Sequence, residues 1–181
     1  MRWCRRFTED EEGTVTIEFL LTFPLLVLWL MGSYVFFDIY KSESKASKAA
    51  YAIADIMSRQ EDVDQAELLD YYTLLDRLLP RASDDKWMRI SSISYDEANE
   101  AYEVEWSYVR APLGDAQKMT NETIPENDLP MVADNDSVIL VEIEIPYTPI
   151  VSSVGLTNLE WKPRVVMRPR FIAKVVCTDC S

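Results

Sequence analysis

The chain has 181 residues, which is enough for one small domain and an anchor. Asp and Glu total 31 against 18 Lys and Arg, and the resulting net charge of −13 argues against binding to nucleic acid. Histidine is absent, which excludes Ser-His-Asp catalysis, Cys-His catalysis and zinc sites built on histidine. An enzyme built on paired carboxylates is not excluded, but we expect a protein without catalytic activity, cofactor or metal.

The N-terminal region predicts a helix that crosses a membrane. Within residues 14–37 the one charged residue is Glu18, and the stretch of residues 19–37 is uncharged. As a helix this stretch spans roughly 28 Å, which is close to the hydrocarbon thickness of a bilayer. A secretory signal peptide fits poorly, because the apolar run is too long and no Ala-x-Ala-like site follows it. We therefore predict a transmembrane helix over residues 14–40, with a kink at Pro24, which removes a backbone donor.

The start of this helix carries a recognisable motif. Residues 13–19 read Gly-Thr-Val-Thr-Ile-Glu-Phe, and Pro24 follows within a Leu-rich run. This segment resembles the processing site of type IV prepilins and, more narrowly, that of the TadE-like minor pilins of the tight-adherence (Flp) pilus system. The resemblance implies that a prepilin peptidase cuts between Gly13 and Thr14. It also implies that Glu18 and Phe19 are the pilin-type Glu-Phe pair.

The same resemblance divides the chain into a leader, an anchor and a head. Residues 1–13 form the leader, in which an acidic run, residues 9–12, separates Arg6 from the cleavage site. Prepilin leaders usually keep positive charge close to the glycine, and the family includes members that are not cleaved. Both a cleaved and an uncleaved leader are therefore retained as alternatives. The numbers of Lys and Arg residues on the two sides of the helix are nearly equal, so the positive-inside rule does not decide its orientation. The short N-terminal tail and the resemblance favour a cytoplasmic N-terminus in the bacterial inner membrane, with residues 41–181 as a periplasmic domain.

The implied function is that of a minor pilin or pseudopilin in the assembly of a Tad/Flp-type pilus. Its implied partners are other pilin-like subunits, which pack against the transmembrane helix, the prepilin peptidase, the Tad/Flp secretion machinery and the lipid bilayer. The alternative is a membrane-tethered periplasmic binding or sensor module that is not processed as a pilin. Entry into the fibre, the choice among the TadE, TadF and TadG groups, and the individual partners remain open.

Two helical stripes follow the membrane span. Small and apolar residues recur at helical spacing beyond residue 40 and predict that the first helix continues as a cover for a sheet; they are Ala46, Ala50, Ile53 and Met57. Asp64, with Glu67 three residues later, predicts the start of a second helix. Its apolar stripe comprises Leu68, Tyr72, Leu75 and Leu79, and Pro80 ends it.

Strand signals begin with residues 88–95, which are rich in Ile and Ser, and residues 96–100 predict a turn. In the next strand we expect one half-buried face formed by Tyr102, Val104, Trp106 and Tyr108. Residues 139–145 alternate in the same way, with Glu142 and Glu144 on a wet face, and prolines interrupt a last strand region over residues 164–176. The predicted fold is therefore α+β and pilin-like, with a small antiparallel sheet of about four strands.

Three other features of the head complete the sequence-based expectations. The long connection of residues 111–136 is interpreted as a solvated loop, with Ca²⁺ binding by residues 134–136 as a minor alternative. Four basic residues near the C-terminus are expected to face the Glu-rich strands or a partner; they are Arg164, Arg168, Arg170 and Lys174. Cys177 and Cys180 have no helix after them and no further zinc ligands, so a terminal disulfide is the plain interpretation if the domain is periplasmic.

Overall fold

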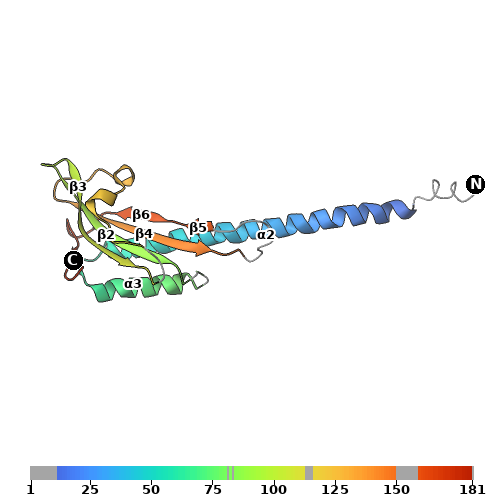
Figure 1. The fold of residues 1–181 in the computed structure, drawn as a ribbon, viewed down its shortest axis with the longest axis horizontal. Coiled ribbons are helices and arrows are strands. Elements are labelled where there is room, and N and C mark those ends of the chain that lie inside the picture. The colour runs from blue at the N-terminus through green and yellow to red at the C-terminus, as the bar shows by residue number, and fades with distance from the viewer. Residues whose placement is uncertain (1–11, 81, 83, 113–115, 150–158, 181) are drawn as a thin grey trace, which may run out of the picture.

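The computed structural model describes residues 12–80, 82, 84–112, 116–149 and 159–180. It is an α+β protein in which a single long helix projects from a head made of a sheet, a second helix and connecting loops (Figure 1). The N-terminal end of the long helix lies far from the head, and the C-terminus lies at the opposite end of the molecule.

The long helix, α2 (Glu12–Met57), contains 46 residues and performs two structural roles. Residues 15–37, which we call the apolar half, project away from the head, whereas residues 38–57, the head half, lie against the sheet on strands β4 and β6. The predicted stripe in the head half is confirmed, because Ala46, Ala50, Ile53 and Met57 are all almost completely buried. Four buried alanines of this half let the helix approach the strands closely, and Ile53 and Met57 fill the core; the alanines are Ala46, Ala49, Ala50 and Ala54.

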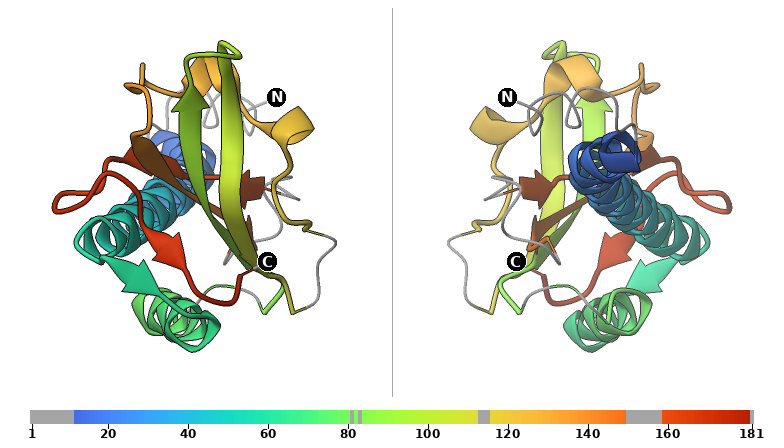
Figure 2. Two further views of the ribbon diagram at one scale, coloured as in Figure 1. Left: turned by 90° about the vertical axis from the view of Figure 1, so that its left-hand side faces the viewer. Right: turned by 90° about the vertical axis from the view of Figure 1, so that its right-hand side faces the viewer.

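The second helix, α3 (Gln65–Leu78), begins where the sequence predicts. The Asp64 carboxylate accepts a hydrogen bond from the backbone N–H of Glu67 at 2.7 Å, which satisfies one free donor of the first turn. The predicted stripe is buried over its whole length, and the helix ends just before Pro80. Figure 2 shows α2 and α3 on the same side of the sheet, so the two stripes close one core between them.

The sheet has five strands rather than the expected four or so, in the order β3-β2-β4-β5, with β6 also paired to β4. Their bounds are β2 (Trp87–Asp96), β3 (Ala101–Arg110), β4 (Ser137–Tyr147), β5 (Leu159–Trp161) and β6 (Arg164–Met167). Both β5 and β6 pair antiparallel with the same edge of β4, one after the other. Pro163 separates them, because it has no N–H to continue the ladder.

A two-stranded parallel pair lies beside this sheet. It joins β1 (Asp62–Val63) to β7 (Val176–Cys177) and holds the C-terminal segment next to the start of α3. The two are adjacent although they come from distant parts of the sequence. Sequence analysis did not predict this pairing, because two-residue strands have no detectable periodicity.

The expectation that four apolar residues of β3 share one face is wrong. The pairing register shifts between Ser92 and Ile93 of β2, so that Glu105 becomes an extra residue in β3. As a result Trp106 packs in the helix-covered core, whereas Val104 packs on the opposite face of the sheet. Tyr108 packs on the same face as Trp106, and Tyr102 packs on the same face as Val104. A bulge changes the alternation without changing the composition, so the sequence pattern alone did not reveal it.

The expected solvent-exposed face of residues 139–145 is also largely covered. Strand β4 is central and almost entirely buried, and Glu142 within it is only 5% exposed. The face opposite the helices carries a second apolar cluster of Ile93, Met119, Val132, Val138 and Leu140. Met119 and Val132 come from the 111–136 connection, which also contains the turns η1 (Asn121–Thr123) and η2 (Glu126–Asp128). This connection is therefore a cover for the sheet, and its interpretation as a solvated loop is corrected.

The four basic residues near the C-terminus pair in different ways. Arg164 contacts Glu142 of β4, and the Lys174 ammonium contacts Glu105 of β3 at 2.5 Å. Both fulfil the expectation of pairing with Glu-rich strands. Arg170 instead binds Asp55 on α2, and Arg168 donates to the Met131 carbonyl. The C-terminal segment is thereby tied to the sheet, the first helix and the covering loop.

The Glu105 pair makes stability depend on pH. The hydrogen bond from Lys174, and after it that from Ser94, lowers the pKa of the Glu105 carboxyl in the folded chain. A lowered folded-state pKa stabilises the fold above the unfolded pKa of about 4.3, and this contribution is lost as pH falls through the folded value. We expect Glu105→Gln to lower the urea midpoint at pH 7 and to match the wild type near pH 3. Glu103→Gln, which removes a charge from the same strand, serves as the control; an equal effect there would contradict the assignment.

Candidate functional site

The apolar half of α2 is the most unusual surface of the molecule. Its large side chains are mostly exposed, including Leu28 at 67% and Trp29 at 72%. The helix is long and apolar enough to cross a membrane, and almost none of its most apolar stretch is buried against the rest of the chain. An exposed apolar surface of this extent on an otherwise acidic protein calls for lipid or other apolar helices around it.

The residues of the predicted processing motif lie at the free end of this helix. Gly13 and Thr14 belong to the first turn of α2, and the Glu18 side chain is exposed one turn further along. Phe19 stacks on Phe23 with ring centroids 5.3 Å apart. The motif thus forms one continuous helical surface with the apolar half. Residues 1–11 of the predicted leader lie outside the described residues.

Pro24 lies inside α2, and the helix continues through it. Its side chain is exposed in the apolar half of the helix. A proline removes one N–H from the helix ladder, and in lipid a neighbouring hydroxyl or helix can satisfy the freed carbonyl. The kink remains a prediction.

The boundary between the apolar half and the head is marked by a specific contact. The Tyr147 hydroxyl, at the end of β4, donates to the Asp38 carboxylate at 2.6 Å. Asp38 is the first ionisable residue after the apolar half. The head therefore reaches the helix at the level where the predicted membrane span ends. Sequence analysis missed this pair, because the two residues are 109 positions apart.

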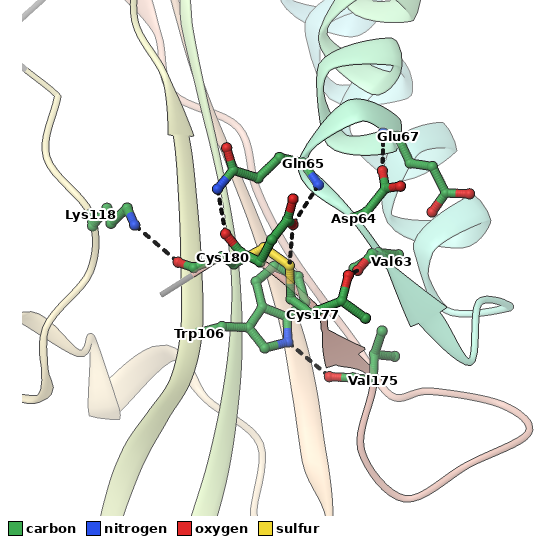
Figure 3. Close-up of a disulfide and its surroundings, with 11 residues drawn as sticks. Val63, Asp64, Gln65, Glu67, Trp106, Lys118, Val175, Cys177 and Cys180 are labelled. Carbon is green, nitrogen blue, oxygen red and sulfur yellow. Dashed lines mark hydrogen bonds between the residues drawn. A yellow bond between two sulfur atoms is a disulfide. The ribbon is translucent and has the colours of Figure 1, made fainter.

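At the opposite end of the head, Cys177 and Cys180 form a disulfide (Figure 3). The short loop that it closes is attached to α3, because Asp179 accepts from the backbone N–H of Gln65 at 2.9 Å. The Lys118 ammonium donates to the Cys180 carbonyl at 2.9 Å, and Figure 3 shows this lysine approaching from the covering loop. The disulfide therefore belongs to a clasp that fixes the C-terminus.

Beneath this clasp lies the buried indole of Trp106. Its N–H donates to the Val175 carbonyl at 2.8 Å, just before β7 begins (Figure 3). The contact joins the bulged strand to the C-terminal segment. Its features are those of a structural anchor: the aromatic ring is in the core, and its one polar atom has a partner.

Metal-binding chemistry has little support in the described part of the chain. The one grouping of three potential ligands there is Cys177, Asp179 and Cys180. Both sulfur atoms are joined in the disulfide, and the Asp179 carboxylate accepts from Gln65. Residues 134–136, the minor Ca²⁺ candidate, do not belong to such a grouping among the described residues. They form a turn in which Asn135 adopts a positive φ of 62°.

One buried ionic cluster was not anticipated. Arg89 donates to one Glu142 oxygen at 2.7 Å, and Arg164 donates to the other at 2.9 Å. Arg89 also donates to the Gln117 carbonyl of the covering loop, and Arg164 also contacts Asp128. The cluster ties the loop, two strands and the central strand together. The sequence feature that could have revealed this cluster is the position of Glu142, which the alternation placed on a solvent-exposed face.

No protein-family model, curated protein or solved structure matches the chain. Its function is therefore inferred from its own residues and their arrangement.

Proposed function

We propose that this protein is a non-catalytic, TadE-like minor pilin or pseudopilin that acts in the assembly of a Tad/Flp-type pilus. In this proposal α2 inserts in the bacterial inner membrane with its N-terminus in the cytoplasm. The head lies in the periplasm, where the clasp disulfide is stable. The apolar half packs against other pilin-like subunits and lipid, and the head meets the secretion machinery.

The observation that carries the proposal is the position of Glu18. It is the one residue of the apolar half that is charged at neutral pH, and it lies one helical turn after the Gly13–Thr14 bond. Cleavage of that bond by a prepilin peptidase would leave a positive amino group on Thr14. The Glu18 carboxylate can neutralise such an amine on its own or a neighbouring chain, and in lipid this attraction is weakly screened.

The two-part use of α2 also supports the proposal. A pilin-like subunit needs a helix that serves as a membrane anchor before assembly and as a packing surface afterwards. It also needs a head that folds on the other half of the same helix. Here the head half buries Ile53 and Met57 beneath the sheet, while almost all of the apolar half is left uncovered; among its described side chains only Val35, near the head, is buried. No linker separates the apolar half from the head half of α2, so a displacement of the head moves the whole helix with it.

Replacement of Glu18 by Ala tests this function. We expect surface piliation to fall by at least about tenfold, because an uncompensated charge in lipid costs a few kcal/mol. Glu43→Ala, which removes an exposed carboxylate from the head half of the same helix, should leave piliation unchanged. Piliation is measured by electron microscopy and by shearing pili from cells that contain equal amounts of each variant. Normal piliation with normal incorporation of the Glu18 variant would remove the role given to this residue.

Intact mass spectrometry of the native protein tests the processing step. The proposal expects a chain that begins at Thr14, and Gly13→Leu should block this cleavage. A full-length mass, combined with unaffected piliation in a strain without this protein, would instead identify a membrane-tethered binding or sensor module.

A further inference from the structure

A cavity of about 410 Å³ opens at the base of the head, where α2 leaves it. Its wall on α2 comprises Asp38, Lys41, Ser42 and Lys45. The opposite wall is formed by the end of β4, at Tyr147, and by the segment after α3. The cavity is large enough for a small polar ligand. Neither the clasp nor the processing motif contributes to it.

Two lysines give this cavity a positive wall on an acidic protein. Lys41 and Lys45 are one helical turn apart, so their side chains leave the same face of α2. Within the described part of the chain, no hydrogen bond or ion pair joins either ammonium to another residue. The hydroxyl of Ser42 lies between them in sequence and adds a donor. Two adjacent cations with a hydroxyl suit a phosphate group.

The negative group in the cavity is already engaged. The Asp38 carboxylate accepts the hydrogen bond from Tyr147 at 2.6 Å, which holds it against β4. Glu43 is exposed on α2 but does not line the cavity. Among the described residues of the lining there are therefore one negative and two positive groups, in contrast to the net charge of −13 of the whole chain.

Lys41 lies at the depth of the headgroup layer of a bilayer, and Lys45 lies just outside that layer. If the hydrocarbon boundary lies at residue 37, Lys41 is about 6 Å and Lys45 about 12 Å beyond it along the helix. The headgroup region is roughly 5 to 8 Å thick on each side, and long lysine side chains extend toward it. Tyr40, which is 64% exposed, lies at the same level, as expected for an interfacial aromatic residue.

We propose that this cavity binds the phosphate of an anionic phospholipid headgroup through Lys41, Lys45 and Ser42. The bound lipid fixes the head against the outer surface of the bilayer. The inference rests on membrane insertion of α2, which is part of the proposed function, and not on pilin processing or on a role in a pilus.

The experiment uses the full chain in nanodiscs of phosphatidylcholine and phosphatidylglycerol, which are then opened by mild detergent for native mass spectrometry. We expect one phosphatidylglycerol to be retained in preference to phosphatidylcholine. Lys41→Gln and Lys45→Gln should each lower this preference about fivefold, as expected for one lysine near an anionic surface. Lys48→Gln removes a matched charge from the same helix outside the cavity and should change it less than twofold.

Each possible outcome bears on the proposal. Equal retention by all variants, or an equal loss in Lys48→Gln, would overturn the site. If the wild type retains inorganic phosphate alone as well as it retains the lipid, and the variants lose both to the same extent, the lipid is ruled out as the source of the phosphate. Flotation with liposomes separates the two proposals: a chain that does not float refutes membrane insertion, whereas a chain that floats without lipid preference refutes only this site. Both lysines are exposed, so circular dichroism should show unchanged folding of the variants.

Discussion

Replacement of Glu142 by Ala is expected to lower the free energy of unfolding by about 3 kcal/mol. Glu142 is the buried centre of a cluster in which Arg89 binds one carboxylate oxygen and Arg164 the other. Removal of the carboxylate would leave the Arg89 guanidinium, whose side chain is 17% exposed, without its charge partner. The cost arises mainly from that uncompensated charge and less from the lost pair itself.

Urea unfolding of the full chain in non-ionic detergent, followed by tryptophan fluorescence, measures this effect. Glu144→Ala is the matched control on the same strand, because Glu144 pairs with the exposed Lys162 and should contribute less than about 1 kcal/mol. Glu142→Gln keeps the shape and part of the hydrogen bonding, so its effect should fall between the two. An effect of Glu142→Ala no larger than that of Glu144→Ala would show that the cluster does not hold the covering loop on the sheet.

Replacement of Ile53 by Ala is the second change with a large expected effect, also about 3 kcal/mol in the free energy of unfolding. Ile53 is completely buried in the head half of α2, between the helix and the sheet. Truncation removes apolar contacts and leaves a cavity that the rigid sheet cannot fill. The head should therefore unfold at a lower urea concentration.

Leu28→Ala provides the comparison within the same helix. Leu28 is 67% exposed in the apolar half, so its truncation should change the stability of the head by no more than about 0.5 kcal/mol. The two variants are compared in one detergent by the same urea titration. Similar losses for both would contradict the division of α2 into an uncovered half and a half that belongs to the core.

The sequence determined the elements whose periodicity is strong and local. The apolar run after Glu18 predicts a bilayer-length helix, and α2 contains it without interruption. Asp64 and Glu67 predict the start of α3, because a short carboxylate can reach the N–H three residues later. Strand β2 follows from the Ile- and Ser-rich composition of residues 88–95, and β4 follows from the alternation of residues 139–145. The processing motif of Gly13 and Glu18 stays a prediction that rests on the resemblance to type IV prepilins.

Only the tertiary structure decided which groups meet across the chain. Burial of Glu142 depends on Arg89, on Arg164 and on a covering loop whose apolar residues are too sparse to predict a packed segment. The bulge at Glu105 moves Trp106 and Val104 to opposite faces, although the composition of the strand stays that of a regular alternation. Such features depend on register and on contacts between distant residues, whereas the periodicity of one segment contains only its local preference.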